Sequence, residues 1–366
     1  DLLGLVNTLY PPVLSEEWDN AGLQAGDPSA ELKRVLVCLD PSEQALDTAR
    51  ETGAQALLTH HPLLFRPLRN LTPVDETGRI LFRSIREGVA VLCAHTNLDK
   101  AAPGLNDWLA ERLGLSDVSP LSAHRGGDLL KLVVFVPRGY EEVVADALFK
   151  GGAGQVGNYD RCSFAVAGTG TFRPGEGTDP FLGRQGETER VGEIRLETIL
   201  PREAQTRVVE KMLKAHPYEE VAYDLIPLAN GRPLVGLGRI GRLAQPSTLS
   251  EFAAGVKAAL GGGPMRFVGD SARKVLKVAV CGGSGASLLN EAARRGADVL
   301  VTGDLKYHEA RSAESRGMAV IDAGHFATEH IMIKGMAEAL RREAERRGLN
   351  IEFIEMEGEE DPFKAV

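Results

Sequence analysis

The stretch Arg34-Val35-Leu36-Val37-Cys38-Leu39 is a continuous run of apolar, β-forming residues. Such a run is typical of a strand that is buried on both faces, as in a parallel sheet. A helix is expected after it, between an N-cap at Ser42 and a stop at Gly53. Two further strands are expected at residues 54–59 and 89–94, with a second helix between them. This β-α-β-α-β order predicts a mostly parallel sheet with helices on its faces.

The last third of the chain repeats this order with matching residues. The offset is 281 − 38 = 243 for the first two strands and 317 − 88 = 229 for the third. The matching pairs are Val35-Leu36-Val37-Cys38 with Val278-Ala279-Val280-Cys281, Leu57-Leu58-Thr59 with Leu300-Val301-Thr302, and Gly88-Val89-Ala90-Val91 with Gly317-Met318-Ala319-Val320. Convergent strand composition could produce either match alone. Two matches in the same order favour an internal duplication.

The middle of the chain follows a different order. Between Leu130 and Leu228 the pattern predicts strand, helix, strand, strand, helix and strand, which is the ferredoxin-like βαββαβ order. Gly-rich segments flank this region on both sides. We therefore expect an α/β fold in which a duplicated core, residues 1–127 and 231–366, is interrupted by an inserted α+β domain at residues 128–230.

Composition excludes several classes of function. The 366 residues are 43% hydrophobic and carry a formal net charge of −9, so no basic excess is available for binding a nucleic-acid backbone. No apolar run approaches the ~20 residues that a membrane helix requires. The four cysteines lack a Cys-x-x-Cys spacing. We expect them to be reduced core residues of a cytoplasmic protein rather than disulfides or thiolate ligands.

Polar side chains that suit metal binding follow several of the expected strands. In parallel sheets, ligands gather at the carboxyl ends of the strands. His60 and His61 follow one such strand, and Asp99 lies shortly after another. His325 and Glu329 have the i, i+4 spacing that places both on one face of a helix. Adjacent histidines on an extended chain point to opposite sides, so each would serve a different ion of a two-metal site.

Each of these signals also has an ordinary structural explanation. Histidines at strand ends often form hydrogen bonds with a loop, any helix can carry a His-x-x-x-Glu spacing, and Asp99 could be the N-cap of the following helix. The loop Gly282-Gly283-Ser284-Gly285 could cradle a phosphate with its N–H groups or form a tight turn. The shared position at one edge of a duplicated sheet is what favours the metal site.

Five motifs together resemble the NGG-one-interacting-factor-three-like family, whose members are often named GTP cyclohydrolase 1 type 2 homologs. They are Trp18-Asp19-Asn20-Ala21-Gly22, Thr59-His60-His61-Pro62, His95-Thr96-Asn97-Leu98-Asp99, Thr302-Gly303-Asp304 and Gly324-His325-Phe326-Ala327-Thr328-Glu329. Residues 216–224 resemble the PII-like or CutA-like domain inserted in longer bacterial members. The resemblance implies a dinuclear metal centre with His60, His61, Asp99, His325 and Glu329 as ligands. It also implies a homohexameric ring.

Two further histidines lie at matching strand ends of the two halves. We expect His95 and His308 to hold or move protons near the metals, and loop hydrogen bonding is the alternative for His95. The sequence thus predicts a hydrolase with two divalent ions acting on a nucleotide or related small molecule. Zn, Fe and Mn suit these ligands alike. The alternative is a metal- or metabolite-sensing assembly that signals through the inserted domain.

Overall fold

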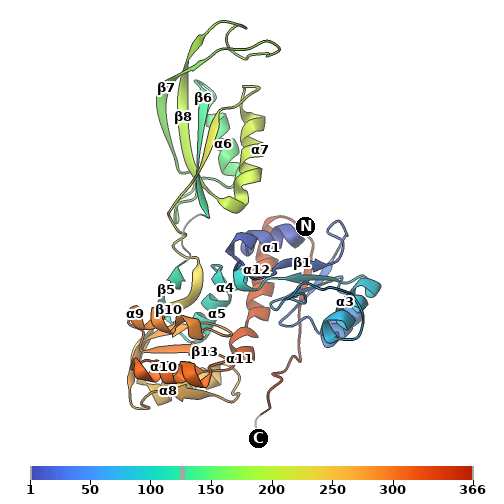
Figure 1. The fold of residues 1–366 in the computed structure, drawn as a ribbon, viewed down its shortest axis with the longest axis vertical. Coiled ribbons are helices and arrows are strands. Elements are labelled where there is room, and N and C mark those ends of the chain that lie inside the picture. The colour runs from blue at the N-terminus through green and yellow to red at the C-terminus, as the bar shows by residue number, and fades with distance from the viewer. Residues whose placement is uncertain (1, 124–127, 365–366) are drawn as a thin grey trace. The chain divides into compact units, whose positions relative to one another are not determined.

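The computed structural model describes residues 2–123 and 128–364, and its contacts divide the chain into two compact units (Figure 1). One joins Asp1–His124 to Pro233–Val366, and we call it the core unit. The other, Arg125–Arg232, is called the middle unit. No helix in the described ranges is long and apolar enough to cross a membrane. The chain thus leaves the core unit once and returns to it.

The first sheet of the core unit has five strands in the order β1-β4-β3-β2-β15. Four run parallel, namely β2 (Arg34–Cys38), β3 (Ala56–Thr59), β4 (Ala90–Cys93) and β15 (Glu352–Glu355), and β1 (Gly22–Ala25) pairs antiparallel with β4. The strands β2, β3 and β4 are almost wholly buried, which explains why their sequences are continuously apolar. The three strands predicted in this third of the chain are confirmed to within two residues at each end.

The second sheet has six strands in the order β11-β14-β13-β12-β10-β5. Three run parallel, namely β12 (Lys274–Val280), β13 (Val299–Thr302) and β14 (Ala319–Asp322). The antiparallel strands are β11 (Arg266–Val268), β10 (Gly236–Thr248) and β5 (Ser116–Ala123). The sheet is therefore mixed, unlike the mostly parallel sheet that was expected. The reason is that β5 and β10 flank the middle unit in sequence and pair directly with each other.

Helices cover both sheets, and their ends follow from local sequence. In α2 (Glu43–Thr52), Ser42 Oγ accepts a hydrogen bond from Ala45 N at 3.0 Å, and Gly53 ends the helix at φ 69. The expected N-cap and stop are thus confirmed. The other helices of this unit are α1 (Leu2–Leu9), η1 (Pro12–Leu14), α3 (Glu76–Glu87), α4 (Thr96–Lys100), α5 (Leu105–Arg112), α8 (Leu249–Ala259), η3 (Ala286–Leu288), α9 (Leu289–Arg294), α10 (Tyr307–Ser315), α11 (His325–Glu329) and α12 (Met332–Arg346).

The helix α5 joins the two halves of the core unit. Its Leu105 packs in the apolar cluster around the first sheet, while Leu109 packs in the cluster around the second. Arg239 of β10 is 1% exposed, and its guanidinium donates to the Asp107 carboxylate of α5 at 2.5 and 2.8 Å. It also donates to the Ala101 carbonyl at 2.6 Å. These contacts tie β10 of the second sheet to α5 and to the backbone at Ala101.

The middle unit is a four-stranded antiparallel sheet in the order β7-β8-β6-β9. Its elements follow the chain as β6 (Leu129–Pro137), α6 (Glu141–Gly151), β7 (Ser163–Phe172), β8 (Glu189–Pro201), η2 (Arg202–Ala204), α7 (Gln205–Ala215) and β9 (Tyr223–Pro227). Figure 1 shows α6 and α7 together on one face of the sheet. Val144 of α6 and Val208 of α7 pack there against Leu132 and Leu196 of the strands. All six elements expected from the sequence are present in the expected order.

Candidate metal centre

Glu329 is a buried carboxylate at which three imidazoles meet. It is the last residue of α11. This helix begins shortly after β14, and Gly324, the residue just before the helix, takes a positive φ of 88. One turn before Glu329, His325 Nε2 lies 2.9 Å from Glu329 Oε2. From the first third of the chain, His61 Nε2 lies 2.9 Å from the same oxygen, and His60 Nε2 lies 3.5 Å from Oε1. His60, His61 and Glu329 are close enough to one another to hold a metal ion.

Asp99 completes the group beside His60. Its Oδ1 lies 3.7 Å from His60 Nε2, and both atoms are buried without a hydrogen-bond partner among the described residues. Leaving two such atoms unpaired is costly, because burial removes the water that would otherwise satisfy them. A cation between them would satisfy both, so the pair fits a metal ion. Asp99 lies inside α4, so its alternative interpretation as a helix N-cap is wrong.

The candidate ligand atoms lie around the two oxygens of Glu329. His60 Nε2 faces Oε1, with Asp99 Oδ1 beside it, whereas His61 and His325 face Oε2, with their Nε2 atoms 3.3 Å apart. Two ligands on one tetrahedral ion, each about 2.0–2.1 Å from it, would be separated by roughly 3.3 Å. The adjacent histidines do not diverge as they would on an extended strand, because β3 ends at Thr59. Both reach the same carboxylate, but through different oxygens.

Each of the three imidazoles is held by a hydrogen bond at its other nitrogen. The Nδ1 contacts are His60 with the Ala94 carbonyl at 3.0 Å, His61 with Asp40 at 2.7 Å, and His325 with Asp304 at 2.7 Å. Such partners orient the ring and fix the tautomer that presents Nε2 to a metal. Sequence reasoning missed Asp40. It follows the end of β2, so the strand-end rule that found the histidines could have found it as well.

Burial and close contacts between carboxylates and imidazoles shift the pKa values at the centre. Burial would raise the pKa of Glu329, but the imidazoles around it hold that pKa well below its usual range. Burial raises the pKa of Asp99. Burial would lower the pKa of His61, yet hydrogen bonds to carboxylates raise it to about 10. The hydrogen bond to Glu329 is the main cause that raises the pKa of His325 to about 9. The carboxylates thus favour positive charge at all of these nitrogens.

The loop Gly282-Gly283-Ser284-Gly285 leaves space for the Glu329 side chain and does not form a phosphate site. A Cβ atom on Gly283, which has φ +60, would lie 2.1 Å from Glu329 Oε1. The N–H groups of Gly282, Gly283 and Gly285 donate to side chains inside the core unit, at 2.9, 3.0 and 2.8 Å. These three N–H groups are therefore not free to bind a phosphate. The phosphate-cradle interpretation is wrong, and the tight-turn interpretation holds.

His95 lies next to the ligand histidines. Its ring centroid is 5.2 Å from that of His60 and 5.9 Å from that of His61, and its Nδ1 bonds to Asp19 Oδ1 at 2.8 Å. Trp18, 60% exposed, places its ring 6.1 Å from that of His95. The motif that contains Trp18 and Asp19 thus supports and borders His95, a role that its sequence alone does not reveal.

His308 lies apart from this group. It is an exposed residue in the first turn of α10, with its ring 5.4 Å from that of Tyr307. In the part of the chain that the structure describes, no hydrogen bond or ion pair joins it to the ligand residues. Its proton-transfer role stays a prediction.

A cleft of about 630 Å³ gives access to the His61 and His325 side of the centre. This volume is within the range of small-molecule sites. His61 and His325, with their partners Asp40 and Asp304, form one part of its wall, and Arg266 adds a cation. The Arg266 guanidinium donates to Asp322 Oδ2 at 2.8 and 2.9 Å, which fixes its position in the cleft.

Comparison with known proteins agrees with the motifs. The model of the Duf34/NIF3 (NGG1p interacting factor 3) family matches residues 1–362. A GTP cyclohydrolase 1 type 2 homolog of Halalkalibacterium halodurans is 43% identical over 356 residues, covering 97% of this chain and 95% of that protein. One from Bacillus subtilis is 41% identical over 362 residues, covering 99% and 97%.

Solved structures agree as well. A Bacillus cereus protein related to NIF3 matches with a TM-score of 0.90 at 41% identity, covering 100% of this chain and 98% of that one. Staphylococcus aureus protein SA1388 matches with a TM-score of 0.78 at 30% identity and the same coverage. The resemblance inferred from the motifs is confirmed: this chain belongs to the Duf34/NIF3 family.

Proposed function

We propose that this protein is a dinuclear-metal hydrolase acting on a nucleotide or a related small molecule. The observation that carries the proposal is that His60 faces one oxygen of Glu329, with Asp99 beside it, while His61 and His325 face the other. We assign these five residues to two ions that share Glu329. Two divalent ions held in this way would lower the pKa of a bound water and polarise the bond to be cleaved. The donor set suits Zn, Fe or Mn. Each ion would receive three protein ligands, which leaves coordination positions for water and substrate.

The residues around the ligands suit the other tasks of such a reaction. His95, fixed by Asp19, is placed to hold or move a proton beside the ligand histidines. Arg266 is placed to bind an anionic group of the substrate in the cleft. The rings of Trp18 and Phe65, 5.9 Å apart and both more than half exposed, offer a surface for a flat ring such as a nucleobase. The relatives' name, GTP cyclohydrolase 1 type 2 homolog, agrees with a nucleotide substrate.

We also propose an internal duplication of the core unit, a ferredoxin-like insert and a hexameric assembly. An internal duplication is supported by pairing register, since the residue pairs of one sheet recur in the other at the offsets of 243 and 229. These pairs are Val35–Ala56 with Val278–Val299, and Leu57–Val91 with Leu300–Val320. The sheet order of the middle unit supports a ferredoxin-like, PII-like insert at residues 128–230 between core halves 1–127 and 231–366. Assembly into a cytoplasmic homohexamer is proposed from the family resemblance.

The second candidate function is a metabolite-sensing assembly that signals through the middle unit. A separate pocket in that unit, with its own aromatic wall and a buried carboxylate, favours this candidate. The two functions are compatible, because the pocket shares no residue with the metal centre.

Elemental analysis and turnover together test the hydrolase. Purified protein should contain two divalent ions per chain, and nucleotides and phosphoesters should be screened with the wild type and with His325→Ala. We expect turnover that the variant loses along with metal. A further variant, His308→Ala, should keep both ions, and unchanged turnover in it would remove His308 from the mechanism. A wild type that binds two ions but hydrolyses nothing would refute the hydrolase, and binding of one ion or none would refute the dinuclear centre.

A further inference from the structure

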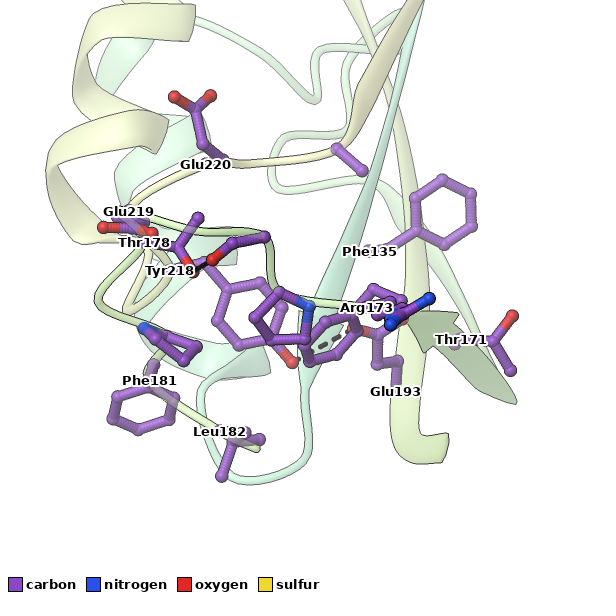
Figure 2. A pocket seen from close by; sticks show the side chains of 16 residues that line it. Phe135, Thr171, Arg173, Thr178, Phe181, Leu182, Glu193, Tyr218, Glu219 and Glu220 are labelled. Atoms are coloured by element: carbon purple, nitrogen blue, oxygen red, sulfur yellow. Dashed lines mark hydrogen bonds between the residues drawn. The ribbon is translucent and has the colours of Figure 1, made fainter. Parts of the chain in front are cut away.

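The middle unit contains a pocket of about 420 Å³, which is a volume suited to a small metabolite. It lies between the end of β7, the loop after β7, and the turn that joins α7 to β9. Phe135 of β6 and Glu193 of β8 form its base in the sheet. Figure 2 shows the hydroxyl of Tyr218 beside the Glu193 carboxylate. All of its lining residues belong to the middle unit.

Aromatic rings form much of the wall. The Tyr218 ring lies 6.2 Å from the Phe172 ring and 6.1 Å from the Phe181 ring, measured between centroids. Phe181 in turn packs edge-on against Tyr140 at 5.6 Å. Phe135 adds a further ring to the lining. The negative faces of aromatic rings attract cations, and they do so most strongly where water is excluded.

A buried carboxylate lies in the same pocket. Glu193 is 8% exposed, and the Tyr218 hydroxyl donates to its Oε1 at 3.1 Å. No Lys, Arg or His of the described chain forms an ion pair with it. Gly170 opens the space that this side chain occupies, because a Cβ there would lie 2.0 Å from Glu193 Oε2. A buried carboxylate held by one phenol is short of positive charge, since buried charges are ordinarily paired.

The turn that carries Tyr218 is fixed in place before any ligand binds. His216 Nδ1 accepts the Tyr218 N–H at 3.1 Å, and its Nε2 donates to the Phe135 carbonyl at 3.0 Å. Burial lowers the pKa of His216, so the imidazole stays neutral and keeps both bonds. Burial and the bond to Glu193 raise the pKa of Tyr218, so the phenol stays protonated and directs the carboxylate. The pocket is therefore preorganised.

We propose that this pocket binds a small organic cation with an alkylated ammonium group, held over the rings of Tyr218, Phe172 and Phe181 and paired with Glu193. Charge favours a cation, because the lining has three carboxylates (Glu193, Glu219 and Glu220) against one guanidinium, Arg173. A bare divalent ion fits poorly, since it needs about six oxygen ligands and far less space. Alkyl groups on the nitrogen fit the rings, whereas an unsubstituted ammonium would keep its water. The proposal does not rest on the hydrolase.

Choline and its uncharged isostere 3,3-dimethyl-1-butanol provide the test. The two have nearly the same shape and differ by the positive charge on the central atom. Isothermal titration of the full-length protein should show choline binding at least tenfold more tightly than the alcohol, as expected for a desolvated cation on aromatic rings. Equal binding of both compounds, or no heat of choline binding in the titration, would overturn the proposal.

Variants locate the binding within the pocket. Glu193→Gln keeps the shape of the side chain and should weaken choline binding at least tenfold while leaving binding of the alcohol unchanged. The matched control is Glu197→Gln, which lies on the same face of β8 but pairs with Lys131 and Arg195 outside the pocket. Circular dichroism and thermal unfolding check that both variants fold. An unaffected Glu193→Gln, or an equal loss in Glu197→Gln, would show that choline binds elsewhere.

Discussion

Replacement of Asp304 by Asn tests how the carboxylates behind the histidines contribute to metal binding. Asp304 Oδ2 lies 2.7 Å from His325 Nδ1, while its side chain is 48% exposed. Asp304 has a positive φ of 55, a conformation that Asn tolerates well, so the backbone should not change. The amide oxygen can still accept from Nδ1, and only the charge is lost. We therefore expect the low end of the usual effect, about tenfold in affinity or about 1.4 kcal/mol.

The loss should be confined to one ion. His325 and His61 face Glu329 Oε2, whereas His60 faces the other oxygen and Asp99 lies beside His60. Competition with a coloured zinc chelator should therefore give one dissociation constant raised tenfold and a second that is nearly unchanged.

Two further aspartates serve as comparisons for Asp304→Asn. Asp40→Asn should give a similar effect, because Asp40 holds His61 in the same way at 2.7 Å. Asp270→Asn, in an exposed turn, should have none. Equal weakening of both ions, or of neither, would refute the division of the ligands into two sets.

The remaining predictions concern the shared Glu329 carboxylate, the protons that metal binding releases, and the contribution of Arg239 to stability. Glu329→Gln should lose both ions, so elemental analysis that still finds two would contradict its bridging role. The raised pKa values of His61 (about 10) and His325 (about 9) mean that the metal-free protein holds two protons that a metal must displace. Zinc affinity should therefore rise with pH up to this range. Burial would lower the pKa of His60, but the carboxylates around it raise that pKa as well. Calorimetry in buffers of different ionisation enthalpy should therefore find two protons or more released at pH 7.5. Arg239→Ala should lower the free energy of unfolding by about 3 kcal/mol in urea titrations, because it leaves the partly buried Asp107 carboxylate and several carbonyls without their buried donor. Arg242→Ala, exposed on the same strand, should change it little.

Local patterns predicted most elements of the fold. Apolar runs located β2, β3 and β4, and capping residues located α2, because buried strands and helix ends depend on neighbouring residues. The antiparallel pair β5 and β10 was not foreseen. In the sequence the whole middle unit separates these two strands, and in the structure they pair directly within one sheet. Nothing within either strand's own sequence identifies its partner.

At the site, too, the sequence predicted arrangements within one segment but not contacts between segments. The i, i+4 spacing of His325 and Glu329 predicted that one helix face would carry both, and α11 has that arrangement. The position of Asp40 behind His61 did not follow from any motif. It depends on how the ends of β2 and β3 lie beside each other.

By itself, the amino-acid sequence determined which strands end in histidines and carboxylates, and it carried the motifs of the family. Only the tertiary structure decided which of these ends meet. His61 and Glu329 lie 268 positions apart, and they meet in a core unit whose two sheets are joined by α5 and Arg239. The room for Glu329 likewise depends on Gly283, whose missing side chain matters only once α11, which ends 46 residues further along the chain, packs against it. The physical reason is that hydrogen bonding and capping act over a few residues, whereas a metal centre requires atoms from distant segments to be placed within a few tenths of an ångström.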